Sequence, residues 1–144
     1  MKTYWDTSGL VRAYVLRQEP AGITRSHSVA EFFCVLSGPG LVVIEGGKTL
    51  KRALPPALAA KAVRDICSRL EFVDLNGQQA VQAMEDSTKV GHIIGKNIHD
   101  WMHCQAAEKA GVERIMTVNH ADFQRMTKLR LETPSKDAPI QPGI

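Results

Sequence analysis

The sequence predicts an α/β fold in which helices cover both faces of a mostly parallel sheet. The first observation is that short β-prone runs alternate with helical patterns along the chain. The second is that helices separate most successive strands, so crossover connections place those strands parallel in one sheet. The third is the length of 144 residues, which suits one domain with its own core.

The spacing of apolar residues and the residues that interrupt each run predict the elements of the first half. They are a strand at 3–5, a helix at 8–16, a short strand at 22–25, a helix at 28–36 and a β-hairpin at 41–45 and 48–52. Gly38-Pro39-Gly40 ends the second helix. Gly46-Gly47 suits the hairpin turn, which needs positive φ.

The second half continues the alternation. Its predicted elements are a helix from Pro55-Pro56 to residue 70, a strand at 72–75, helices at 77–90 and 97–110, a strand at 114–118, a short helix at 120–126 and a strand at 129–132. Proline favours the first turn of a helix, and Gly111 is suited to end one. We assign residues 1–133 to the domain. Residues 134–144 hold three prolines and no aromatic residue, which predicts a flexible C-terminal tail.

Composition indicates a soluble cytoplasmic protein. Hydrophobic residues make up 44% and charged residues 23% of the chain. No apolar run approaches the roughly 20 residues of a membrane-spanning helix, and Asp6 interrupts any secretory signal, so no membrane partner is expected. The three cysteines are far apart in apolar patterns and are expected to be reduced and buried. The net charge of +3 permits contact with a polyanion without demonstrating it.

Four carboxylates lie near predicted helix starts, namely Asp6, Glu31, Asp100 and Asp122. One explanation is structural, because acids in a first helical turn are favoured by the helix dipole and by capping. Ser28 and Glu31 have the spacing of a capping box. The other explanation is a functional cluster, because strand ends and helix starts of a parallel α/β fold gather at one edge of the sheet.

A cluster of acids points to a metal. Two like charges about 4 Å apart repel by about 4 kcal/mol at an effective dielectric constant of 20, and a divalent cation removes that repulsion. A ligand set made only of oxygen atoms favours Mg²⁺ or Mn²⁺. Such a metal lowers the pKa of a bound water and stabilises charge on a phosphate, which indicates phosphodiester hydrolysis.

Four motifs then carry a family resemblance: YWDTS (4–8), SVAEFF (28–33), IHDW (98–101) and TVNHADF (117–123). In this order they resemble the PIN-domain family, specifically the VapC-type toxins of type II toxin–antitoxin pairs. The resemblance implies a PIN-like three-layer α/β/α sandwich, usually a homodimer. It also implies an endoribonuclease that depends on Mg²⁺ or Mn²⁺ and is silenced by an antitoxin.

The resemblance also implies roles for individual residues. Asp6 and Asp100 would be the main metal ligands, and Glu31 would complete the site directly or through water. Asp122 or Asn119 would supply the fourth position. Ser8 and Thr117 would support the carboxylates by hydrogen bonds. Many family members carry an acid where Asn119 stands, so one metal or two remains an open alternative.

The sequence also permits other interpretations. The first is an inactive PIN fold that serves as a protein-interaction module, for which Asn119 leaves room. The second is a phospho-receiver-like module, which is disfavoured because no Asp-Asp pair follows the 3–5 strand. His99 and His103 suggest zinc, but a second ligand pair is missing. Lysines and arginines at 12, 17, 48, 51, 52 and 96 form either an RNA-guiding rim or an ordinary solvated surface.

Overall fold

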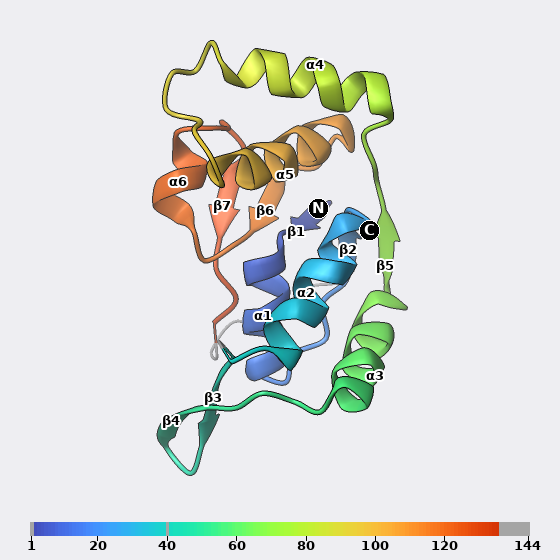
Figure 1. Cartoon of the computed structure of the whole chain (residues 1–144), viewed down its shortest axis with the longest axis vertical. Helices are drawn as coiled ribbons and strands as arrows, with labels where there is room; N and C mark the ends of the chain where they lie inside the picture. Colours follow the sequence, from blue (N-terminus) through green and yellow to red (C-terminus); the bar gives the residue numbers. More distant parts are fainter. Residues whose placement is uncertain (1, 40, 136–144) are drawn as a thin grey trace.

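The structure, a computed structural model, describes residues 2–39 and 41–135 (Figure 1). Its centre is a five-stranded sheet in the order β5-β2-β1-β6-β7, and every neighbouring pair is parallel. The sheet strands are β1 (Thr3–Trp5), β2 (Gly22–Thr24), β5 (Leu70–Phe72), β6 (Arg114–Met116) and β7 (Arg130–Glu132). The predicted α/β class with a mostly parallel sheet is confirmed.

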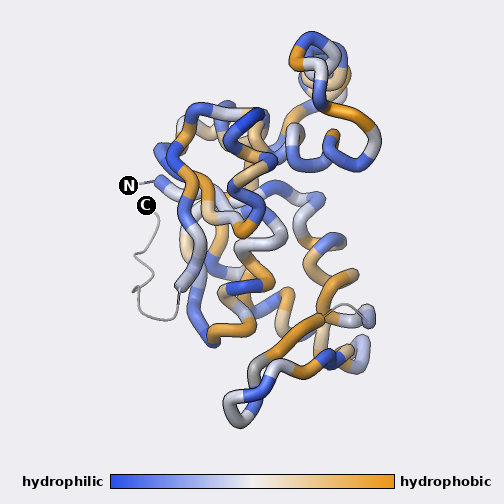
Figure 2. Tube along the Cα trace, turned by 90° about the vertical axis from the view of Figure 1, so that its left-hand side faces the viewer, coloured by the Kyte–Doolittle hydropathy of each residue, from blue (hydrophilic) through white to orange (hydrophobic). Residues whose placement is uncertain are grey.

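Helices cover both faces of the sheet. They are α1 (Thr7–Val15), α2 (His27–Ser37), α3 (Pro56–Cys67), α4 (Gly77–Ser87), α5 (Asn97–Lys109) and α6 (His120–Gln124). A separate antiparallel hairpin is formed by β3 (Val42–Glu45) and β4 (Lys48–Lys51). The hairpin lies at one end of the long axis and α4 at the other, as the views of Figures 1 and 2 agree.

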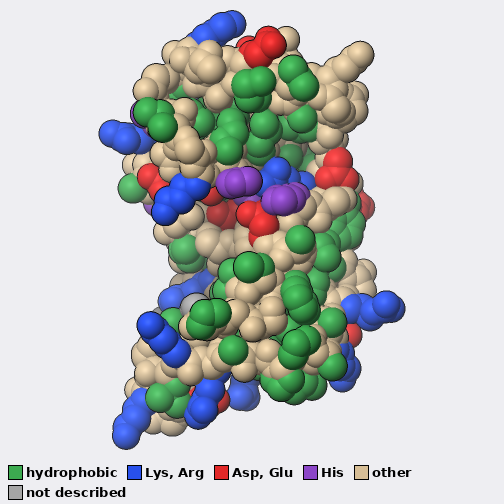
Figure 3. Space-filling model, in the orientation of Figure 1, with side chains coloured by type: hydrophobic (Ala, Val, Ile, Leu, Met, Phe, Trp, Pro, Cys, Tyr) green, Lys and Arg blue, Asp and Glu red, His purple; other side chains and the backbone are tan. Residues whose placement is uncertain are grey.

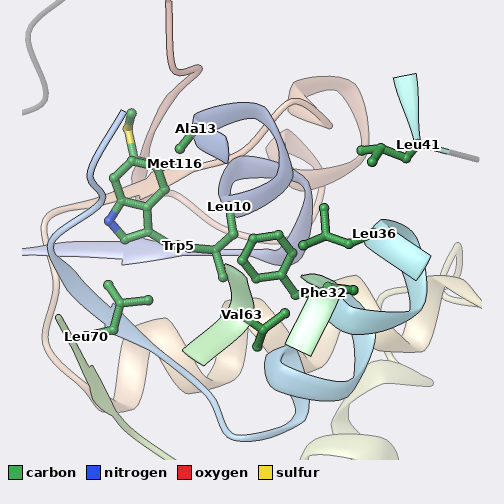
Figure 4. Close-up of a cluster of buried hydrophobic side chains, with 10 residues drawn as sticks. Trp5, Leu10, Ala13, Phe32, Leu36, Leu41, Val63, Leu70 and Met116 are labelled. Carbon is green, nitrogen blue, oxygen red and sulfur yellow. The ribbon is translucent and has the colours of Figure 1, made fainter. Parts of the chain in front are cut away.

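The central strand β1 separates two hydrophobic cores, because successive side chains of a strand point to opposite faces. Trp5 packs into a core with α1, α2 and α3, in which Leu10 points toward Phe32 (Figure 4). Tyr4 packs into the other core with Trp101 and residues of α5 and α6. Burying one large apolar side chain contributes about 1.5–3 kcal/mol, so these two cores fix the three-layer arrangement.

Pairing of β1 with β6 brings distant parts of the chain together. Trp5 is in register with Met116, and the Asp6 backbone N–H donates to the Met116 carbonyl oxygen at 3.2 Å. The segments that follow the two strands therefore leave the sheet side by side at its carboxyl edge. This places Asp6 next to Thr117.

Two element boundaries differ from the prediction. The helix expected to reach residue 70 ends at Cys67, because Leu70 begins β5 and pairs with Gly22 of β2. The strand expected at 72–75 is β5 at Leu70–Phe72. Leu70 is a buried strand residue in the core under α3, although its spacing also fits the apolar face of a helix.

The chain remains packed beyond the predicted end of the domain. Pro134 is buried, and Gln18 Nε2 donates to the carbonyl oxygen of Ser135 at 2.7 Å. The rest of the predicted tail, 136–144, lies outside the described residues. Within residues 2–39 and 41–135, no helix has the length and apolar character to cross a membrane. The expectation of buried thiols holds for Cys104 but is wrong for Cys34, which is exposed on α2, and Cys67 is only half-buried.

Candidate functional site

Asp6 is the most tightly held acid of the site. It follows β1, caps the N-terminus of α1 and is 2% exposed. Its Oδ1 accepts from the Gly9 backbone at 2.7 Å and from Ser8 Oγ at 2.8 Å, and its Oδ2 accepts from Thr117 Oγ1 at 2.6 Å. Burial raises the pKa of Asp6, and the His103 ring and these hydrogen bonds oppose the rise.

Ser8 and Thr117 connect Asp6 to the end of β6. Their hydroxyl oxygens lie 3.2 Å apart. Ser8 Oγ accepts from the Val118 backbone, and Thr117 Oγ1 accepts from the Asn119 backbone, both at 3.0 Å. Each hydroxyl therefore satisfies a backbone donor and holds the Asp6 carboxylate at the same time.

Glu31 reaches the site from α2. Its Oε1 accepts from Thr7 Oγ1 at 3.0 Å, lies 3.2 Å from His103 Nε2 and forms an ion pair with Arg25 at 3.6 Å. Burial alone would raise the pKa of Glu31. The contacts with His103, Thr7 and Arg25 outweigh burial and lower the pKa to about 2. Glu31 is therefore a charged carboxylate throughout the neutral range.

Asp100 reaches the site from the first turn of α5 and is half-buried. Its carboxylate makes no hydrogen bond or ion pair with any residue that the structure describes. Burial and the negative charges of Asp6, Asp122 and Glu31 raise the pKa of Asp100 to about 6, against the opposing effect of His103. The carboxylate is thus held among like charges without a compensating donor.

These acids line one cleft of about 600 Å³. Asp6, Glu31 and Asp100 line it together with Ser8 and Asn119. Its other lining residues include His103, Arg12, Val11, Val15, Val35 and Val42. Asp122 is exposed in α6 outside this lining and acts on Asp100 through its charge. Acidic and histidine side chains stand side by side at the waist of the molecule (Figure 3).

Helix capping does not explain most of these acids. Asp6 caps α1, but α2, α5 and α6 have no side-chain hydrogen bond at their N-caps among the described residues. The capping-box interpretation of Ser28 and Glu31 is wrong, because Ser28 Oγ accepts from Thr24 Oγ1 inside the core. Glu31, Asp100 and Asp122 are therefore not placed by capping bonds.

The cleft fits a hard cation in donor type and in charge. Three carboxylates supply oxygen donors, and Asp100 lacks any other described partner. Nowhere in the described chain are three His, Cys, Asp or Glu side chains already arranged to hold a metal ion. Asp6, Glu31 and Asp100 are the residues that would hold such a cation, directly or through bound water.

Sequence reasoning missed the partners of Glu31. Tyr4 Oη lies 2.7 Å from His103 Nδ1, and the other nitrogen of that ring faces Glu31. Thr7 and Arg25 complete this environment. The one sequence signal was that His103 follows His99 by four residues and so shares its helix face, which had suggested zinc instead.

The raised pKa of Asp100 predicts a pH-dependent stability. The ordinary value is 3.8 and the folded value about 6, so its unfavourable contribution is absent below pH 4 and complete above pH 6. We expect Asp100→Asn to gain about 1–3 kcal/mol over the metal-free wild type as pH rises through this window, after allowance for partial exposure. Urea unfolding between pH 4 and pH 8 measures the difference, and parallel curves would contradict it.

No family model and no curated protein matches the sequence. The fold is similar to that of a chain in the 2.2 Å structure of VapBC-1 from nontypeable Haemophilus influenzae, with a TM-score of 0.58 and 17% identity. The similarity covers 92% of this chain and 98% of that chain. At this identity, the similarity establishes the α/β fold.

Proposed function

We propose that the protein is an endoribonuclease that depends on Mg²⁺ or Mn²⁺ and hydrolyses RNA phosphodiester bonds. One observation carries the proposal: Asp6, Glu31 and Asp100 come from three separate elements and line one cleft, where burial and the charges of the neighbouring acids raise the pKa of Asp100. Structural acids that serve as caps or surface charges do not need to meet in this way. A bound divalent cation would offset the repulsion between these carboxylates and would account for their proximity.

The protein's own groups have distinct roles in this proposal. Asp6 and Asp100 are the principal ligands, Glu31 completes the set, and Asn119 or Asp122 supplies the fourth position. Ser8 and Thr117 keep Asp6 from rotating through their hydrogen bonds. The cation would lower the pKa of an attacking water and stabilise the charge that builds on the phosphate.

Basic residues near the cleft suit an RNA backbone. Arg12 lines the cleft beside the acids, and Lys48, Lys51 and Arg52 are exposed on the hairpin and its exit. Phosphate contacts by lysine and arginine supply affinity that does not depend on base sequence. We propose that these residues hold RNA across the mouth of the cleft.

We further propose a toxin–antitoxin role. The sequence motifs resemble VapC-type toxins, and the fold is similar to that of a chain in the VapBC-1 structure. The valine-lined part of the cleft, which includes Val11, Val15 and Val35, suits the apolar residues of a partner segment beside the acids. An antitoxin seated there would block the carboxylates. The resemblance also implies a homodimer, which sedimentation would test.

The direct test is cleavage of a panel of structured RNAs with Mg²⁺, with Mn²⁺ or with EDTA. We expect cleavage with either metal, loss of cleavage in EDTA, and recovery when metal is restored in excess. Mapping of the cleaved ends shows whether scission is internal. Cleavage that continues unchanged in EDTA would refute the proposed metal dependence.

A second candidate is an inactive fold that serves as a protein-interaction module. Among the described residues, no three acids are arranged to hold a metal ion, and Asn119 supplies no charge. Calorimetric titration with Mn²⁺ separates the two functions. Binding at micromolar to millimolar metal supports the nuclease, whereas no binding in that range together with no cleavage supports the module.

A further inference from the structure

Two pairs of side chains join α2 to α5. His27 and His99 form the outer pair, with ring centroids 5.9 Å apart and planes 6° from parallel. Glu31 and His103 form the inner pair, at 3.2 Å. Glu31 follows His27 by four residues on α2, and His103 follows His99 by four residues on α5. Residues at this spacing share one face of a helix, so both pairs lie between the same faces of α2 and α5.

A third residue, Tyr4 of β1, contacts the His103 ring of the inner pair. Tyr4 Oη lies 2.7 Å from His103 Nδ1, and the two rings meet edge to face. Tyr4 is fully buried, and burial raises the pKa of its phenol, so the hydroxyl keeps its proton. A buried hydroxyl proton needs an acceptor, and His103 Nδ1 is the one acceptor in reach among the described residues.

The contact with Tyr4 favours one arrangement of the proton on the His103 ring. If Nδ1 accepts from Tyr4, the ring proton lies on Nε2 and points at Glu31 Oε1. Thr7 donates to the same oxygen. Glu31 Oε2 has no hydrogen-bond partner within the described part of the chain and is left available to a ligand in the cleft.

We propose that Tyr4 and His103 are positioning residues that orient the Glu31 carboxylate for metal binding, a role that rests on the proposed function. Both nitrogens of the His103 ring are engaged, one with Tyr4 and one with Glu31. His103 is therefore neither a zinc ligand nor a proton donor to RNA. It acts through Glu31.

The first test needs no activity. Nitrogen-15 NMR of the metal-free protein reports which nitrogen of His103 carries the proton, after assignment with His103→Gln. We expect the Nε2–H tautomer in the wild type and a mixture of tautomers in Tyr4→Phe, because the phenylalanine ring no longer donates to Nδ1. A ring that carries its proton on Nδ1 alone would leave no N–H toward Glu31 and would overturn the inference.

The second test measures Mn²⁺ affinity by calorimetry. Outer-shell partners of metal ligands typically change affinity by about 10–100-fold. We expect that loss in the double variant Tyr4→Phe/His103→Leu, which removes both polar partners together and so leaves no buried donor unsatisfied. His103→Gln should recover much of the affinity, because its amide N–H takes the place of Nε2–H.

The kinetic signature separates positioning from a structural role. At saturating Mn²⁺ the double variant should approach the wild-type turnover, with the loss confined to the metal concentration needed for half-maximal rate. Unchanged affinity in the double variant, or equal loss in His103→Gln, would refute the role. If the wild type binds no Mn²⁺, the proposed function fails, and the tautomer experiment alone decides whether the hydrogen-bonded chain exists.

Discussion

Asp100→Asn is expected to reduce RNA cleavage at saturating Mg²⁺ by at least about 100-fold, because the variant loses the charge of a principal metal ligand. At about 1.4 kcal/mol per factor of ten in rate, this loss corresponds to about 2.8 kcal/mol of transition-state stabilisation. This carboxylate has no hydrogen bond or ion pair among the described residues, so its loss breaks no contact that holds the fold. The amide keeps the size of the side chain and removes its charge. The loss should therefore be functional, with the fold intact. Initial rates on a labelled RNA measure it.

Asp65→Asn is the matched control for this substitution. Asp65 is an exposed acid on α3 and does not line the cleft, so the same change of chemistry should leave cleavage unaltered. Circular dichroism and urea unfolding establish that both variants are folded. Cleavage by Asp100→Asn within a few fold of the wild type would remove Asp100 from the site and with it the argument from clustered acids.

The contact of Asp6 with Thr117 was expected from the family resemblance alone, but its physical basis is visible in the sheet. Parallel strands leave a sheet at the same edge, and Asp6 and Thr117 each follow such a strand. That the two strands are neighbours depends on strand order, which the motifs implied only through the family resemblance. The hydroxyl contacts of Ser8 and Thr117 with Asp6 follow once that order is given.

The surroundings of Glu31 lay beyond sequence reasoning. Periodicity tells which residues share a helix face, but it does not tell which face of another helix lies opposite. The contact of His103 with Glu31 joins two helices that are 72 residues apart at these positions. The capping box failed for a similar reason, because Thr24 from the neighbouring strand competes for Ser28. Local sequence patterns predict hydrogen bonds between residues close in the chain, but here contacts made by tertiary packing formed in their place.

The close approach of α1 to β6 predicts the largest effect on stability. A Cβ atom at Gly9 would lie 2.3 Å from the Met116 carbonyl oxygen and 2.9 Å from its carbonyl carbon, and both are backbone atoms that no side-chain rotation can move. In an exposed helix interior, Gly→Ala stabilises by about 1 kcal/mol. At this position we expect the opposite sign, a loss of about 2–4 kcal/mol in the free energy of unfolding.

Gly77→Ala is the control, since Gly77 begins α4 and nothing lies within 4 Å of its added Cβ. Its free energy of unfolding should be unchanged or slightly higher.

The effect of Gly9→Ala also reaches the site, because the Gly9 backbone N–H donates to Asp6 Oδ1 and the new Cβ would lie 3.3 Å from that oxygen. Separation of α1 from β6 would loosen the hydroxyl contacts that hold Asp6, so Mn²⁺ affinity should fall together with stability. A Gly9→Ala protein as stable as the wild type would mean that α1 does not approach β6 this closely, and the described geometry of Asp6 would then be wrong.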